Sequence, residues 1–110
     1  FQLTVYKLPF LGKEVSWGII ENRQYLRALE NMASLYNIDQ NIEEAEEIYK
    51  LILRLNPNDN QGIRYYLAGL YEGLFIEDIE IMFKEGDQKQ DWSKLEDLVK
   101  RQSMLHNFFE

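Results

Sequence analysis

RLNPNDNQGIRYY, residues 54–66, is the stretch that decides the fold of this chain. Pro57 cannot continue an α-helix, because its ring removes a backbone N–H and disfavours helical geometry at the residue before it. Asn58 and Asp59 are both residue types that cap the start of a helix. The stretch therefore predicts that one helix ends just before Pro57 and that the next begins within a few residues, so the two must pack closely.

The segment before this stretch has the spacing of an amphipathic helix. Asn41 stands at the expected N-cap with Glu44 three residues later, which is the pattern of a capping box. Glutamates crowd the first turns and Lys50 and Arg54 follow, an order that suits the helix dipole. The apolar side chains recur every three or four residues and form one stripe: Ala45, Ile48, Tyr49, Ile52 and Leu55.

Four further helices are predicted from the same period. One begins at Asn22, and its apolar stripe is Tyr25, Leu29, Met32, Ala33 and Tyr36. Another covers residues 60–72, and the next follows Gly73 with Ile76, Ile79, Met82 and Phe83. Residues 85–90 are expected to be a linker. The last helix begins near Asp91, or at Ser93 with Glu96 as its capping-box partner, and its apolar positions are Leu95, Leu98, Val99, Leu105 and Phe109.

The totals limit the classes of function. A chain of 110 residues suits one small domain. The net charge of −7 argues against a nucleic-acid-binding face, and no apolar run approaches the ~20 residues of a membrane span. Cysteine is absent, which rules out a thiol nucleophile and a zinc–thiolate site and fits a reducing compartment. Residues 1–10 have no signal-peptide pattern, so a cytoplasmic protein is expected.

The start of the chain differs from the rest. Phe1, Leu3 and Val5 alternate with polar residues, which is a strand-like pattern, and Pro9 and Gly12 then interrupt regular structure. We expect residues 1–21 to form an extended arm whose aromatic side chains cover one end of the helical array.

The two helix pairs between residues 22 and 86 are copies of one unit. A shift of 34 residues aligns their apolar positions, and the aligned residues are Leu29 with Ile63, Met32 with Tyr66, Tyr36 with Leu70 and Tyr49 with Phe83. The first unit carries the expected tetratricopeptide pattern at Met32, Ala33, Tyr36, Ala45, Tyr49 and Pro57. The second unit departs from it at Leu67, Ile79 and Gly86.

On these residues the chain resembles the tetratricopeptide-repeat family over residues 22–58 and 59–86. The NPNDNQGIR junction is also similar to one that recurs in a poorly characterised, mainly bacterial subgroup. The resemblance implies an all-α fold, a short α-solenoid of helix pairs. Lys100 and Arg101 fall on apolar positions of the repeat, so residues 91–110 are expected to form a capping helix instead.

The resemblance also implies a binding surface on the first helix of each unit. Repeats of this family usually bind partners on their concave face. The residues that fall there are Arg27, Glu30, Ser34, Asn37, Gln61, Arg64, Ala68 and Tyr71. Arg27 and Arg64 would grip a carboxylate and Tyr71 would supply an aromatic anchor. Glu30 and Ser34 stand where the chaperone-tail-binding subclass has Lys and Asn, which argues against that ligand.

Residues that could carry chemistry have simpler structural interpretations. His106 is the only histidine and has no nucleophile or acid at a recognisable spacing. Glu43, Glu44, Glu46 and Glu47 lie on a helix, whereas calcium loops alternate their ligands around a glycine. Trp17 and Trp92 are typical buried anchors. No phosphate-binding glycine motif is present. We therefore expect no enzyme activity, no cofactor and no metal.

Three roles fit the sequence. The first is a non-enzymatic scaffold that binds a peptide or helix of another protein in the concave groove. The second is a structural, self-associating segment of a larger protein, forming a homodimer through exposed repeat ends. The third is an accessory domain of an enzyme whose catalytic part is absent from this chain.

Overall fold

The computed structural model describes residues 16–108, and this part of the chain is all-α. Its helices are α2 (Ile20–Ile38), α3 (Ile42–Leu55), α4 (Ile63–Glu72), α5 (Ile76–Lys89) and α6 (Ser93–Ser103). None of the helices within residues 16–108 is long and apolar enough to cross a membrane. The strand-like pattern of residues 1–5 and the apolar position Phe109 lie outside the described residues.

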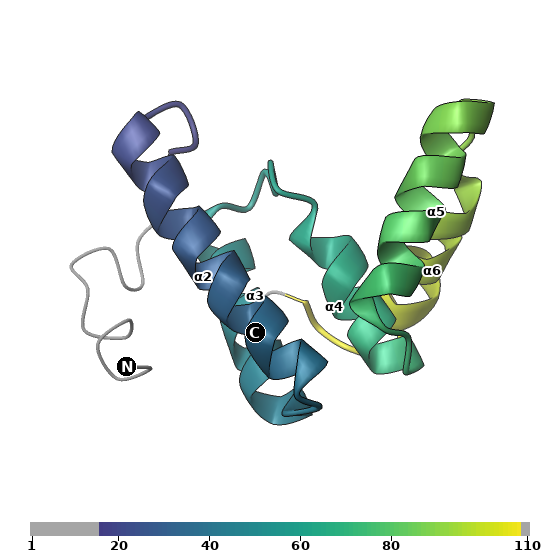
Figure 1. Cartoon of the computed structure of the whole chain (residues 1–110), viewed down its shortest axis with the longest axis horizontal. Coiled ribbons are helices and arrows are strands. Elements are labelled where there is room, and N and C mark those ends of the chain that lie inside the picture. The colour runs from purple at the N-terminus through teal and green to yellow at the C-terminus, as the bar shows by residue number, and fades with distance from the viewer. Residues whose placement is uncertain (1–15, 109–110) are drawn as a thin grey trace.

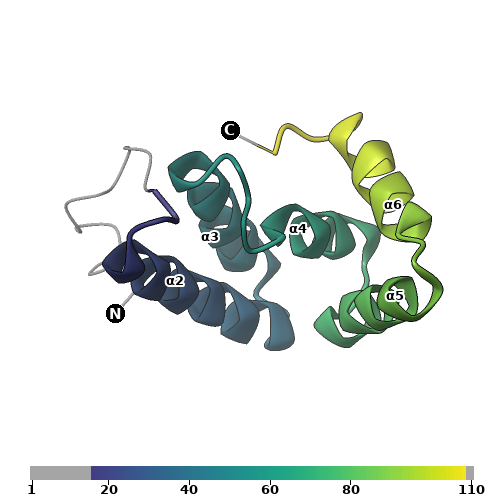
Figure 2. The same cartoon turned by 90° about the horizontal axis from the view of Figure 1, so that it is seen from above.

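The helices are arranged as two groups joined by α4. Figure 1 shows α2 and α3 together on one side, α5 and α6 together on the other, and α4 between them, and Figure 2 shows the same order from above. The most extensive packing is between α2 and α3. Both α3 and α6 pack against α4, whereas α2 touches α5 only at a few residues. Helix α4 is thus the element through which the two groups are held together.

Helix α3 supplies most of the core. The predicted stripe from Ala45 to Leu55 is buried, and Leu51 and Leu53, which lie off that stripe, are buried as well. A helix that is apolar on nearly every side must have neighbours on nearly every side. This holds for α3, which lies between α2 and α4. Tyr49 is fully buried, and its hydroxyl oxygen accepts a hydrogen bond from Asn37 Nδ2 at 3.1 Å.

The junction between α3 and α4, residues 56–62, ends one helix and starts the next, as the sequence predicts. Asp59 has a positive φ of 52° and is nearly buried. Its Oδ1 accepts a hydrogen bond from the backbone N of Ile63 at 2.7 Å, and its Oδ2 accepts one from the backbone N of Arg64 at 3.0 Å. Asp59 therefore satisfies the first backbone donors of α4 from outside the helix. Because Gly62 adopts a left-handed conformation, α4 starts at Ile63 and not near Asn60 as expected.

The other predicted capping boxes do not form. Asn41 is at the N-cap of α3, as predicted, but its side chain makes no capping hydrogen bond. Helix α6 does begin at Ser93, yet its N-cap is Trp92, and Glu96 accepts a hydrogen bond from Tyr65 instead of closing a box. At α6, a hydrogen bond from another helix therefore engages the glutamate side chain that the local pattern assigns to the capping box.

The expected linker at residues 85–90 is wrong, because α5 continues to Lys89. Gly86 is buried in this helix, and a Cβ added there would come within 2.5 Å of Trp92 Cδ1. The missing side chain lets the Trp92 ring lie against the α5 backbone, just before α6 begins. Gly86 therefore acts as a close-packing residue and not as a helix terminator.

The end of the chain also differs from the prediction. Helix α6 ends at Ser103, so Leu105 does not continue its apolar stripe and is 74% exposed. The described chain then runs on without helix through residues 104–108, called here the C-terminal segment. Phe108, only 6% exposed, joins the core in its place.

Replacing Asp59 with Ala tests whether this carboxylate holds α4 in place. The variant leaves two backbone donors at the start of α4 without their acceptor and removes the ion pair to Arg64. We expect the free energy of unfolding in urea to fall by about 2 kcal/mol. Asp39→Ala, at the exposed end of α2, is the matched control and should change it by less than about 0.5 kcal/mol. Equal losses in the two variants would contradict the role of Asp59.

Candidate peptide-binding groove

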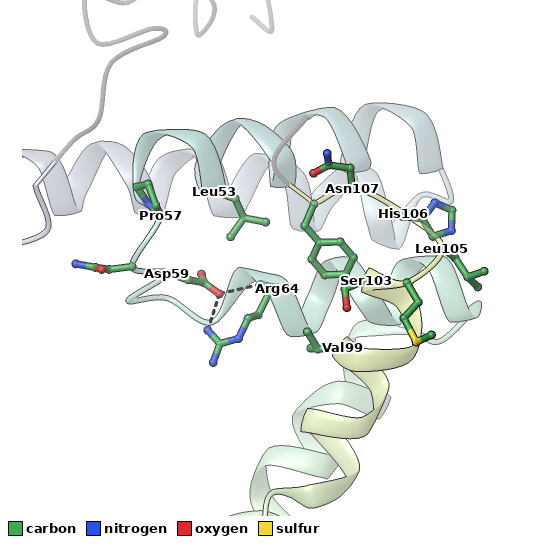
Figure 3. Close-up of a pocket in the computed structure, with 12 residues that line it drawn as sticks. Leu53, Pro57, Asp59, Arg64, Val99, Ser103, Leu105, His106 and Asn107 are labelled. Atoms are coloured by element: carbon green, nitrogen blue, oxygen red, sulfur yellow. Dashed lines mark hydrogen bonds and ion pairs between the residues drawn. The ribbon is translucent and has the colours of Figure 1, made fainter.

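An open groove of about 920 Å³ lies between the junction and the C-terminal segment (Figure 3). Figure 3 shows Leu53 and Pro57 on one side of it and Ser103, Leu105 and His106 on the other. Helix α4 contributes Arg64 to the lining, and helix α6 contributes Val99. The lining is mixed: the apolar side chains are Leu53, Pro57, Val99, Met104, Leu105 and Phe108, and the polar ones are Asn58, Asp59, Arg64, Ser103, His106 and Asn107.

A chain of polar contacts fixes the charged part of the groove. Arg64 Nη1 lies 3.0 Å from Asp59 Oδ2, and Arg64 Nη2 donates to Tyr65 Oη at 2.6 Å. The Tyr65 hydroxyl then donates to Glu96 on α6. The Arg64 guanidinium carbon lies 4.4 Å from the centre of the Tyr65 ring. This chain ties the junction, α4 and α6 together, and both terminal nitrogens of Arg64 are engaged in it.

The C-terminal segment forms the other side of the groove and packs through rings. The imidazole of His106 stacks on Tyr71 of α4 with ring centroids 3.7 Å apart and an interplanar angle of 3°. Phe108 lies tilted against the same tyrosine at 5.9 Å. The Tyr71 hydroxyl donates to Glu46 on α3. Burial, together with this hydrogen bond and the charge of Glu46, raises the pKa of Tyr71 well above its usual value.

The structure separates the eight residues predicted to line one groove. Glu30 of α2 accepts a hydrogen bond from Gln61 Nε2 at 2.8 Å, so these two do share a face. Arg27 lies close enough to Glu30 to affect the ionisation of its carboxyl. Ser34 is near Tyr49 on the same side of α2. Burial raises the pKa of Glu30, whereas its hydrogen bond with Gln61 acts in the opposite direction.

The other four predicted residues lie elsewhere. Arg64 lines the junction groove, and Tyr71 packs against the C-terminal segment that forms its other side. Ala68 and Asn37 are buried, with 0% and 4% of their surface exposed. For the three residues of α4 the reason is the late start of that helix. Gln61 precedes it and the left-handed Gly62 separates them, so helical spacing cannot be extended from Gln61 to residues 64, 68 and 71. Asn37 lies on α2, where its side chain turns inward to donate to the Tyr49 hydroxyl.

Aromatic side chains form the contact between α4 and α5. Tyr66 of α4 packs against Phe83 of α5 with ring centroids 6.1 Å apart, and Tyr65 meets the same ring edge-on at 5.2 Å. Burial raises the pKa of Tyr66 to about 12, and the charges of Glu80 and Glu30 act in the same direction. An ionised Tyr66 is therefore disfavoured in the folded chain.

The raised pKa of Tyr66 predicts an alkaline loss of stability that Tyr66→Phe should reduce. The folded pKa of about 12 lies above the ordinary value of 10.0, so the stabilisation is complete below pH 10 and is lost as the pH rises toward 12. Urea unfolding of both proteins at pH 7 and at pH 11 measures this. The two should be similar at pH 7, and the variant should lose less between the two pH values. An identical loss would show that Tyr66 does not contribute.

The remaining candidates for chemistry have structural contacts. Trp17 accepts a hydrogen bond at its carbonyl oxygen from Arg23 Nε at 2.6 Å, and the guanidinium carbons of Arg23 and Arg27 both lie 5.4 Å from its ring. Within the acidic run of α3, Glu46 contacts Tyr71 and lies 3.7 Å from Lys50 Nζ. Among residues 16–108 no three His, Cys, Asp or Glu side chains are grouped so that they could hold a metal ion.

Two residues that complete the groove, Leu53 and Phe108, lie outside the apolar stripes that the sequence predicts. The predicted last helix also includes the C-terminal segment, which is not helical. One signal was available for Leu53, because Leu51, Ile52 and Leu53 are consecutive and a helix that is apolar all round is covered on several sides. No helical or strand period marks Phe108.

Comparisons with known proteins add no relative. The chain matches no protein-family model, no curated protein and no solved structure.

Proposed function

We propose that this chain is a tetratricopeptide-like interaction module that binds an extended segment of another protein in the junction groove. The observation that carries this proposal is the mixed lining of a groove of about 920 Å³. Binding pockets combine apolar walls with a few polar groups that orient the ligand. Leu53 and Val99 supply the wall, and Asn58 and Ser103 supply exposed polar groups.

The rim of the groove supports a protein partner. Met104 and Leu105 are adjacent in sequence, and they are 81% and 74% exposed. Adjacent apolar side chains of this size at the edge of a groove are typical of interaction surfaces. Asp59 and Arg64 both line the groove and are paired with each other, so their charges largely cancel. A ligand would therefore meet polar groups and aromatic rings more than a net charge.

The helical arrangement supports the short solenoid as the finer description of the fold. In such arrays each unit packs on its neighbour, and α3 packs on α4 across the junction in this way. Helix α6 covers α4 on the far side, as a capping helix does. The second pair, α4 and α5, packs less closely than α2 and α3, which agrees with its departures from the repeat pattern.

A selection of peptides from a displayed random library on the immobilised chain tests the proposal. Peptides that bind the unchanged chain should lose at least about tenfold in affinity on Leu105→Glu, because a charge is placed at the apolar rim. Leu35→Glu, which changes an exposed leucine of α2 (65% exposed, against 74% for Leu105), is the matched control and should bind normally.

A further variant distinguishes the junction groove from the surface of α2 that carries Arg27, Glu30 and Ser34, called here the α2 face. Arg27→Ala should leave binding unchanged, because Arg27 lies on the α2 face and does not line the groove. Loss of binding on Arg27→Ala with normal binding by Leu105→Glu would place the site on the α2 face and contradict the groove. Failure to select any peptide would contradict the binding function itself.

A second role, self-association, is favoured by an apolar patch at the opposite end of α2. Leu35, Ile38 and Ile42 are exposed there, and Phe75 is exposed at the start of α5. Ile38 and Phe75 also line a hollow of about 310 Å³ between the two helices. This patch is separate in its residues from the junction groove.

Solution mass measured over a concentration series tests self-association. If the patch joins two copies, the mass should rise from 13.2 kDa toward twice that value, and Ile38→Glu should restore the monomer. Leu105→Glu is the control and should dimerise like the unchanged chain. A constant monomer mass at all concentrations would contradict this second role.

A further inference from the structure

The apolar patch of Leu35, Ile38, Ile42 and Phe75 lies where the end of α2 meets the start of α5. Both helix ends are toward the bottom of Figure 1. Ile38 and Phe75 line the hollow of about 310 Å³ between them, and none of the four residues lines the junction groove. Large apolar side chains that stay exposed around a hollow are typical of an interaction site.

The charged side chains beside the patch are acidic. Asp39 and Glu43 directly follow Ile38 and Ile42 in the chain, and Glu77 lines the hollow itself. Residues 28–49 and 65–83, the two stretches that contain the patch, include no Lys or Arg. The end of α2 therefore keeps its partial negative charge, which adds to that of the carboxylates.

These carboxylates are not neutralised by the rest of the molecule. Within residues 16–108, no ion pair engages Asp39, Glu43 or Glu77. A partner that brings positive charge would therefore find acceptors that are not already occupied, unlike the paired Asp59 of the junction groove.

Local hydrogen bonds hold both sides of the patch in place. After α2, Gln40 adopts a left-handed conformation with φ 62°, and the backbone N of Asn41 donates to the carbonyl oxygen of Tyr36 at 2.8 Å. Before α5, the backbone N of Phe75 donates to Asp78 Oδ2 at 2.8 Å. A surface that is fixed before binding loses less conformational entropy when a partner docks.

The acidic surroundings favour a partner of opposite charge over a second copy of this chain. In a two-fold dimer the same patch faces itself, so Asp39, Glu43 and Glu77 would approach the same three side chains of the other copy. Like charges brought together across an interface oppose association. Nucleic acid and an anionic membrane surface are disfavoured for the same reason, since both attract basic patches.

We propose that the patch binds a basic amphipathic helix of another protein. Leu35 and Ile38 stand one turn apart on α2 and form a short ridge, against which the side chains of another helix pack. The apolar face of the partner helix would lie on this ridge and send one side chain into the hollow beside Phe75. Its flanking Lys and Arg side chains would face the acidic residues.

Fluorescence anisotropy with a labelled designed peptide tests this binding. The probe is a helix-forming peptide of about 18 residues, roughly five turns, with leucines on one face and lysines on the others. The unchanged chain should bind it, and more weakly as the salt concentration rises. The same peptide with glutamate in place of every lysine should not bind.

Two exposed isoleucines test the apolar part of the contact. Ile38→Ser should weaken binding of the lysine peptide at least about tenfold, because it removes a side chain at the centre of the patch. Ile81→Ser, on α5 and outside the patch, is the matched control and should bind normally. Circular dichroism checks that both variants fold.

Two double variants test the charges. Asp39→Asn with Glu77→Gln should weaken binding about fivefold at low salt. Asp87→Asn with Asp97→Asn makes the same change of net charge at exposed positions outside the patch, and it should leave the affinity unchanged.

Four outcomes would overturn the inference. They are absence of binding, equal binding of the glutamate peptide, equal weakening by both double variants, and a dimer of the unchanged chain that Ile38→Glu dissociates. Loss of binding on Leu105→Glu with normal binding by Ile38→Ser would place the peptide in the junction groove, which overturns the inference and leaves the proposed function standing.

Discussion

The carboxylate of Asp59 is the interaction on which the rest of the structure depends. Pro57 ends α3. Two residues later, the Asp59 carboxylate accepts hydrogen bonds from the first backbone N–H groups of α4 and forms an ion pair with the Arg64 guanidinium. A nearly buried carboxylate needs such partners, because an unpaired charge away from water is costly. The direction of α4 relative to α3 is therefore set by a proline that ends one helix and, two residues later, a carboxylate that caps the next.

The groove follows from that arrangement. Arg64, fixed by Asp59, donates a hydrogen bond to the Tyr65 hydroxyl, which in turn donates to Glu96 on α6. A second connection lies at the other end of α4, where Gln102 Nε2 donates to Glu72 at 2.8 Å. With α3, α4 and α6 held in this way, Tyr71 presents a ring face on which the C-terminal segment packs. The stretch that separates two helices thus also forms one side of the proposed binding site.

The sequence predicted the helices well, because their periodicity and the Pro57 break depend on neighbouring residues. It placed the buried stripe of α3 and the end of α3 before Pro57 correctly, but it began α4 too early, near Asn60 and not at Ile63. It could not predict that Glu96 bonds to Tyr65 instead of capping α6, nor that Gly86 receives the Trp92 ring, since both depend on residues from other helices. The groove residues were divided because a single left-handed residue, Gly62, shifts the face that α4 presents.

Binding of a partner at the junction groove is tested most directly by the change in backbone amide chemical shifts when a selected peptide is added to the isotope-labelled chain. The largest changes should fall at residues 58–64 and 99–108, and Arg27 and Glu30 on α2 should hardly change. Changes concentrated on Arg27, Glu30 and Ser34, with the junction unaffected, would contradict binding at the junction groove.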